Sequence, residues 1–337
     1  MGLPTLITNE ISSLERKKQV YRTPQKEYCS AEPETDVSSH AFIIPAELTQ
    51  DTGAWPADGP IKLGSDAHKQ LFCKTLLDTH DPYRPKVLDW PQLGEEAQKR
   101  ITSLPIWDIA VQTENRAGLN VCTYAEGISD TLLNKAVQLN GFEERRHRHV
   151  LANLVEAYGI KLAPEPTYPR PKDPEWAFMV TGYSECIDSF FAFGLFKAAA
   201  DTGYFPPELI QTFDPVVNEE ARHILFFVNW VAWHRRNMPL WRRPYFELKV
   251  LAVWIFLIYE RMGIAGDVSN GQQDNNFTMN GAEQLGADID VGELIALCVA
   301  ENDRRMKPYD NRLKRPKFVP FMARIALKFI GPKKKAA

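Results

Sequence analysis

Residues 143–147 read Glu-Glu-Arg-Arg-His, and residues 219–223 read Glu-Glu-Ala-Arg-His. The second Glu and the His of each copy are three positions apart, so in an α-helix both side chains project from one face. A carboxylate and an imidazole in this arrangement can reach the same metal ion. An isolated pair of this kind is usually a solvated surface pair, whereas a repeated pair favours a metal site between helices. The sequence therefore predicts a helical metal centre built around this repeat.

Hydrophobic spacing and capping residues predict that each copy lies in the second helix of a hairpin. The four helices are expected over residues 105–126, 130–158, 173–200 and 206–236, the last with a kink or restart at Asp214-Pro215. The Pro-rich segment 159–173 reaches at most about 50 Å at roughly 3.3 Å per residue. A helix over 130–158 is about 43 Å long at roughly 1.5 Å per residue. The segment can therefore run the length of a bundle, which makes the second and third helices parallel.

The rest of the chain is expected to surround this bundle, and no stretch predicts a strand ladder. Shorter helices are expected at 65–79, 95–104, 244–262 and 291–306, with a polar arm at 1–63 and a Gly-, Asn- and Gln-rich loop at 263–281. The uncharged run Val250–Tyr259 is only about 15 Å long as a helix, so it predicts a buried helix and not a membrane span. These signals divide the chain into an N-terminal arm with an accessory helix (1–90), a di-metal four-helix bundle (91–240), accessory helices (241–311) and a basic amphipathic tail (312–337).

One glutamate at matching depth in the first helix of each hairpin completes the expected ligand set. Counted from the turn of the first hairpin, Glu114 lies level with Glu144. In the second hairpin, Glu185 lies level with Glu220 in the same way. Glu126 lies at the turn itself and cannot be level with Glu144. The predicted metal ligands are Glu114, Glu144, His147, Glu185, Glu220 and His223.

The pattern Glu…Glu-x-x-His…Glu…Glu-x-x-His over residues 105–236 resembles the ferritin-like di-iron carboxylate superfamily. The Arg before each His and the acid before each ligating Glu are similar to its oxygen-activating branch. That branch includes the soluble acyl-carrier-protein desaturases, the bacterial multicomponent hydroxylases and the ribonucleotide reductase small subunits. The di-iron N-oxygenases carry a further His where this chain has Val216. The resemblance implies an all-α fold, a ferritin-like four-helix bundle with a long crossover and extra N- and C-terminal helices.

The other charged residues of the repeat are expected to support the ligands. A ligating imidazole usually donates its second N–H to a carboxylate, which fixes the orientation of the ring. Glu143 and Glu219 are suited to this role. The resemblance implies that the ion pairs cross between helices, so that Glu143 meets Arg222 and Glu219 meets Arg146.

Residues that share the ligand-bearing faces are expected to border a dry space beside the metals, because small side chains leave room and aromatic rings exclude water. The candidates are Ala117, Gly118, Gly182, Ala192, Phe193, Phe196, Ile224, Phe227 and Trp230. The alternative is that they form an ordinary core. Asp188 is a further supporting candidate, and the resemblance suggests Ser189 as a catalytic hydroxyl near the oxygen site. Both are alternatively polar residues satisfied within the bundle.

A carboxylate-rich site without thiolate suits hard to borderline metals, which favours two iron ions, with manganese or a mixed pair as alternatives. The resemblance implies that O2 is activated to hydroxylate or desaturate an apolar or aromatic organic substrate. Electrons would come from an external reductase or ferredoxin, because no flavin, nicotinamide or iron–sulfur motif is present. The alternatives are a rubrerythrin-like peroxidase or ferroxidase, an RNA-modifying di-iron hydroxylase, and a metal-bearing interaction protein.

The composition is that of a globular protein. The chain has 337 residues, 44% of them hydrophobic and 25% charged, with a net charge of −3, which excludes bulk disorder and a uniformly basic nucleic-acid binder. Five separated cysteines and no signal-peptide pattern favour the cytoplasm. From Asn311 onward there are nine Lys or Arg and no Asp or Glu. This tail predicts peripheral contact with an anionic membrane or nucleic acid, or docking on the acidic body. A homodimer is also left open.

Overall fold

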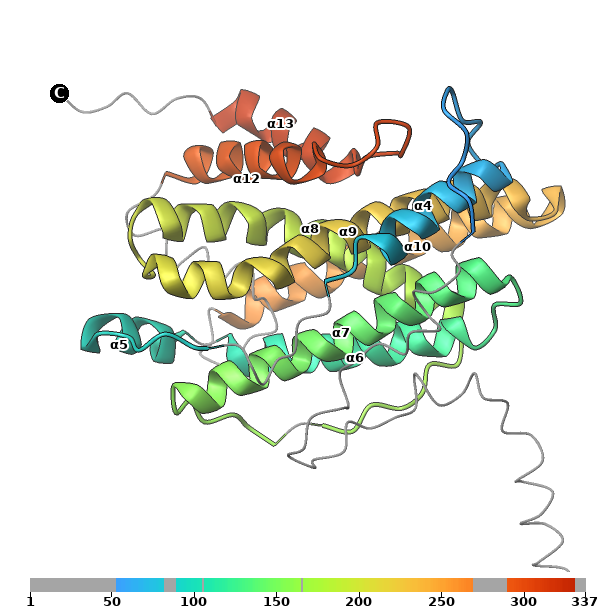
Figure 1. Ribbon diagram of the computed structural model, residues 1–337. Coiled ribbons are helices and arrows are strands. Elements are labelled where there is room, and N and C mark those ends of the chain that lie inside the picture. Colours follow the sequence, from blue (N-terminus) through green and yellow to red (C-terminus); the bar gives the residue numbers. More distant parts are fainter. Residues whose placement is uncertain (1–52, 82–88, 105, 165, 269–289, 331–337) are drawn as a thin grey trace, which may run out of the picture.

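The helical class predicted from the sequence is the class observed. The computed structural model describes residues 53–81, 89–104, 106–164, 166–268 and 290–330, and every regular element within these ranges is a helix (Figure 1). Most of the predicted arm and of the predicted loop over 263–281 lies outside the described residues. Among the helices that are described, none is both long enough and apolar enough to cross a bilayer.

Four long helices carry the repeated motif and its predicted partners. They are α6 (Trp107–Ala125), α7 (Thr131–Ala157), α8 (Pro174–Asp201) and α9 (Pro207–Asn237). The carboxylates of Asp130 and Asp173 cap α7 and α8, because each accepts a hydrogen bond from the backbone N–H three residues later. Pro215 lies inside α9, which does not restart there as predicted. Packing of α9 against α8 and α4 outweighs the one backbone hydrogen bond that Pro215 cannot donate.

The segment between α7 and α8 runs back along α6. Near the start of α6, the Asp108 carboxylate accepts a hydrogen bond from the Ala163 N–H at 2.6 Å. Just past its end, Glu126 pairs with Arg170. The chain therefore spans the length of α6 between these two contacts, and α8 begins at the same end as α7 (Figure 1). This is the long crossover predicted for 159–173, and it makes α7 and α8 parallel.

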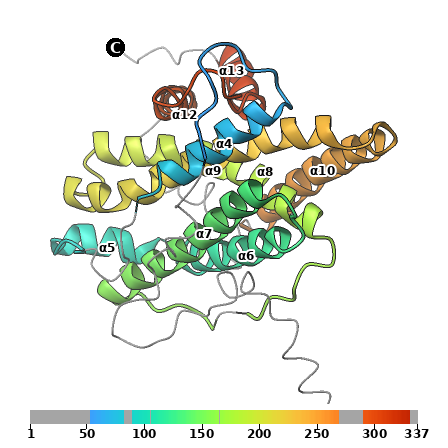
Figure 2. The ribbon, with the colours of Figure 1, turned by 45° about the vertical axis from the view of Figure 1, so that its right-hand side comes forward.

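Further helices surround the four that carry the motif and its predicted partners (Figure 2). They are α4 (Asp66–Asp78), α5 (Glu95–Ser103), α10 (Arg243–Val268), α12 (Val291–Met306) and α13 (Phe318–Ile330), with a 3-10 turn η3 at Leu240–Arg242. α4 packs against α7 and α9, α10 and α12 pack against α8, and α13 packs against α12. α10 continues past its predicted end at Met262. The predicted tail over 312–337 is helical in α13, and its last residues, 331–337, lie outside the described part.

The main core lies between α4, α6, α7, α8 and α9 and contains a group of aromatic rings. The rings of Phe178 and Trp230 meet edge to face at 4.8 Å, and the ring of Phe227 packs against both. α8 passes very close to α9 here, since a Cβ atom placed on Gly182 would lie 2.2 Å from the Phe227 ring. Glycine at this position therefore sets the distance between the two helices.

The apolar run Val250–Tyr259 is not buried as predicted. Val253 and Leu257 are fully buried, whereas Leu251 and Ile255 are 55% and 58% exposed. An uninterrupted apolar run has no polar side, so its sequence does not reveal that one face lacks a partner. α10 thus covers α8 with one face and leaves the other uncovered.

Candidate metal centre

Both copies of the repeated motif face the same point between α7 and α9. His223 Nδ1 lies 2.7 Å from Glu144 Oε1, and His147 Nδ1 lies 3.0 Å from Glu220 Oε1. Each of these four residues offers one ligand atom within 4.8 Å of the other three. Both short contacts join one motif to the other, so the two copies form a single cluster. These buried carboxylates and imidazoles could hold a metal ion.

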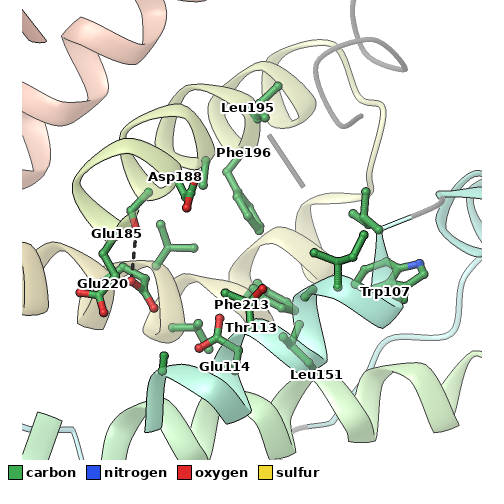
Figure 3. A pocket seen from close by; sticks show the side chains of 18 of the residues that line it. Trp107, Thr113, Glu114, Leu151, Glu185, Asp188, Leu195, Phe196, Phe213 and Glu220 are labelled. Atoms are coloured by element: carbon green, nitrogen blue, oxygen red, sulfur yellow. Dashed lines mark hydrogen bonds between the residues drawn. The ribbon is translucent and has the colours of Figure 1, made fainter. Parts of the chain in front are cut away.

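The predicted ligands from α6 and α8 reach the same region. Glu114 Oε2 lies 3.6 Å from His147 Nδ1. Glu185 lines the same cavity as Glu114, Glu144 and Glu220, and Figure 3 shows it next to Glu220. The four predicted glutamate ligands therefore line one cavity, the two predicted imidazole ligands contact Glu220 and Glu144, and all six come from four helices.

Burial has opposite outcomes within this cluster: at Glu220 burial is outweighed by the neighbours, His147 above all, so its pKa is lowered, whereas two other carboxyls have raised pKa values. Burial and the charges of Glu220 and Glu144 raise the pKa of Glu114 to about 8. Burial and the same two neighbours raise the pKa of Glu185 well above its usual range. Burial acts to lower the pKa of His223, but the charges and hydrogen bonds of Glu144 and Glu143 together outweigh burial and raise that pKa well above its usual range. A bound cation would stabilise these carboxylates in their charged form, so the donor set fits a metal.

Each imidazole is held on its far side by a glutamate of the other motif. His147 Nε2 lies 2.9 Å from Glu219 Oε2, and His223 Nε2 lies 2.7 Å from Glu143 Oε2. These hydrogen bonds fix the rings so that the Nδ1 atoms face the carboxylate cluster. The predicted supporting role of the two glutamates is the arrangement observed.

The two arginines of the motif pair with the same glutamates. Arg146 donates to Glu219, and Arg222 donates to Glu143 at 2.6 Å. This is the crossed pairing that the resemblance implied. The second terminal nitrogen of Arg222 donates to the carbonyl of Leu76 in the last turn of α4. That of Arg146 donates to the carbonyl of Asp81, which follows the helix. Two guanidinium groups thus balance two carboxylates, and the C-terminal end of α4 favours their positive charge.

His80 belongs to this network, although no spacing pattern marks it. It follows α4 directly, and its Nδ1 lies 2.5 Å from Glu143 Oε1. The side chain is 7% exposed, and its Nε2 is buried without a hydrogen-bond partner. His80, Glu143 and Glu219 form a second group of potential ligands behind the first. The feature of the sequence that points to His80 is its position just after a helix whose first turn is capped by Ser65. The predicted boundary between residues 90 and 91 therefore cuts through the site.

Of the two further candidates, one reaches the cluster and the other lies in the cavity wall. Ser189 Oγ donates a hydrogen bond to Glu220 Oε2 at 3.1 Å. Asp188 accepts hydrogen bonds from Ser184 at 2.8 Å and from Arg261 at 2.6 Å, and it lines the cavity. The Nε2 atom of each imidazole is already bonded to a glutamate of the motif. Asp188 therefore does not take its predicted place behind an imidazole.

A cavity of about 430 Å³ extends from the carboxylates between α6, α8 and α9 (Figure 3). Beyond its acidic end the wall is largely apolar, and Trp107 lies at the far end from Glu185. Four of the predicted bordering residues line it, namely Ala117, Ala192, Phe193 and Phe196. The others face neighbouring helices and are not in the lining, which corrects the prediction for Gly118, Gly182, Ile224, Phe227 and Trp230.

The site combines buried oxygen and nitrogen donors, a charge-balanced network behind the imidazoles and an apolar cavity in front of the carboxylates. Such a combination can bind cations and shield them from bulk water. Comparisons of the chain with known protein families, with curated proteins and with solved structures find no match.

Proposed function

We propose that this protein is a non-haem di-iron oxidoreductase that activates O2 to hydroxylate or desaturate an apolar or aromatic organic substrate. The observation that supports this most is one cluster of four carboxylates and two imidazoles at the end of an apolar cavity. The fold that we propose for α6 to α9 is a ferritin-like bundle, because two hairpins joined by a long crossover carry the ligands.

Two divalent ions match the charge of the cluster. The residues that would hold them are Glu114, Glu144, His147, Glu185, Glu220 and His223. Four carboxylates balance the four positive charges of two such ions, while the arginines of the motif neutralise the glutamates behind the imidazoles. Iron bound here would supply the redox chemistry toward O2. Manganese, alone or with iron, is the alternative metal.

The protein side chains have three tasks in this proposal. Glu143 and Glu219 hold the imidazoles in their ligating orientation. Ser189 orients the Glu220 carboxylate from the cavity side by its hydrogen bond. The apolar wall keeps water away from the acidic end and binds the substrate next to it.

The cavity lining favours organic oxidation over iron storage. A ferroxidase needs a polar, acidic route by which iron ions enter, whereas the wall beyond the ligands is largely apolar, with Leu151, Phe196 and Phe213 among its residues. The two further acids in the wall, Asp188 and Glu260, are each paired with an arginine. A rubrerythrin-like peroxidase, an RNA-modifying hydroxylase and a metal-bearing interaction protein are the remaining alternatives. The electrons for O2 reduction would come from a separate reductase or ferredoxin.

The decisive experiment is metal analysis with an optical spectrum of aerobically purified protein. We expect about two irons per chain in the wild type and less than a tenth of that in Glu144→Ala. Glu156→Ala on the exposed side of the same helix is the matched control and should retain the metal. Equal metal content in the wild type and Glu144→Ala would disprove the site.

The cavity can be tested separately from the metals. Ala192→Trp places a large ring inside the apolar part of the cavity without touching a ligand. We expect this variant to keep its iron but to lose substrate-coupled turnover, measured as O2 consumption by the reduced protein. An unchanged rate with a candidate apolar substrate would argue against the cavity as the substrate site.

A further inference from the structure

Large apolar side chains are exposed on the outer sides of α10 and α13, two helices that meet at one ring contact. These exposed residues, here called the α10–α13 face, are Leu248, Leu251, Ile255, Phe256, Ile258, Tyr259, Phe318, Phe321, Met322, Phe329 and Ile330. Globular proteins rarely leave so many large apolar side chains uncovered in one patch. Such a patch usually marks a binding surface.

The exposed parts of the two helices are neighbours, because α10 and α13 touch. The rings of Trp254 in α10 and Phe318 in α13 are 4.6 Å apart, so the helices touch at this point. On α10 the exposed residues Leu248, Leu251 and Ile255 follow the three- and four-residue steps of a helical stripe. Val250–Tyr259 contains no charged residue, so nothing polar interrupts the stripe there.

Cations lie at the border of this face, and Glu247, an exposed acid on α10, is paired with Arg235. Lys317 and Lys328 are exposed on and beside α13, and Arg242 is exposed where α10 begins. The chain from Asn311 to its end carries nine Lys or Arg and no acid, although the protein as a whole is negative. Trp241, just before α10, is 78% exposed, and an amphipathic ring of this kind favours the boundary between water and lipid.

We propose that the α10–α13 face docks on an anionic membrane surface, with both helices lying in the interface. An apolar helix face with basic flanks binds such a surface by inserting its apolar side chains and pairing its cations with lipid phosphates. A second copy of the chain fits less well, because a two-fold dimer through this face would oppose the basic α13 of one copy to that of the other. This docking does not depend on which reaction the metal centre supports.

The test is flotation of the full-length protein with vesicles of phosphatidylcholine alone and of an equal mixture of phosphatidylcholine and phosphatidylglycerol. We expect binding to the mixed vesicles that weakens at high salt. The double variant Leu251→Glu/Ile255→Glu and the single variant Lys328→Glu should each reduce the bound fraction, the double variant by roughly tenfold or more. Lys99→Glu, an exposed charge reversal on α5, should bind like the wild type.

Circular dichroism and metal content should be the same in every variant as in the wild type. This result would establish that the substitutions act on the surface alone. Absence of wild-type binding to both vesicles would overturn the proposal, as would equal binding by the double variant. A wild-type dimer in sedimentation equilibrium that the double variant converts to a monomer, without vesicle binding by either, would assign the face to a second copy instead. Loss of the di-iron centre in Glu144→Ala with vesicle binding intact would leave the docking proposal standing.

Discussion

His80 Nδ1 lies 2.5 Å from Glu143 Oε1, and the other oxygen of Glu143 lies 2.7 Å from His223 Nε2. These two contacts connect the end of α4 to an imidazole of the candidate metal cluster. A residue outside the repeated motif therefore helps to position a predicted ligand from behind. The orientation of His223 thus depends on a helix that supplies none of the six predicted ligands.

Replacement of His80 by Ala should weaken metal binding without abolishing it. Loss of an outer hydrogen-bond partner typically reduces metal affinity by about 10- to 100-fold, and we expect a reduction near the lower end because Arg222 still holds Glu143. Competition with a chromophoric chelator would measure it. His68→Ala is the control, since His68 is also buried on α4 but bonds Asn229 away from the cluster. Equal affinity in both variants would contradict a positioning role.

Gly182→Ala should destabilise the protein by about 1–3 kcal/mol, because the new methyl group overpacks the contact with Phe227. Denaturant unfolding would measure the loss. Phe227→Leu in the same chain should recover part of it, since the smaller side chain leaves room for the methyl group. Gly94→Ala is the matched control, because a Cβ at Gly94 would meet no atom within 4 Å. A neutral Gly182→Ala would show that α8 and α9 separate easily.

The metal-free protein should lose stability as the pH rises. The pKa of Glu114 is raised to about 8 from an ordinary value of 4.5, so the folded state binds more protons than the unfolded state between these values. Its contribution is therefore favourable near pH 4.5 and declines toward pH 8. Glu114→Gln should flatten the slope of unfolding free energy against pH in metal-free samples. Glu156→Gln, on an exposed part of α7, should keep the wild-type slope.

The ion cluster around Glu175 should have the opposite pH dependence. Hydrogen bonds from His234 and Lys249 lower the pKa of Glu175 to about 2, so its stabilising effect is complete above pH 4.5 and is lost as the pH falls toward 2. Glu175→Gln should cost roughly 2 kcal/mol at neutral pH, and the difference from wild type should shrink in acid. The control Glu247→Gln removes a half-exposed pair with Arg235 and should cost less than about 1 kcal/mol. A difference that persists to pH 2 would exclude this linkage.

The parts of the fold that follow local rules were predictable. Asp130 and Asp173 begin their helices as capping residues because capping involves only neighbouring backbone groups. The crossed pair between Glu143 and Arg222 was expected only through the resemblance of the repeated motif to a known superfamily, because spacing within one helix does not say which residues pair between helices. The crossover between α7 and α8 followed from its length alone.

The parts that depend on packing between distant segments were not predictable. His80 reaches Glu143 across 63 positions in the chain, and no spacing rule relates the two. Gly182 was expected beside an open space, but its lack of a side chain serves a close helix contact instead. The uncovered side of α10 was missed because hydrophobic residues on all sides of a helix predict burial, and only the neighbours decide which side is covered.

The short contacts of the cluster join each motif to the other one, and this matters while the protein is being made. His147 meets the carboxylate of Glu220, and His223 meets that of Glu144, so each half of the cluster is completed by the other hairpin. During synthesis the first motif leaves the ribosome well before the second. A polypeptide that has made only its first hairpin holds only half of the donors, so under the proposed function metal binding follows the joining of the two hairpins.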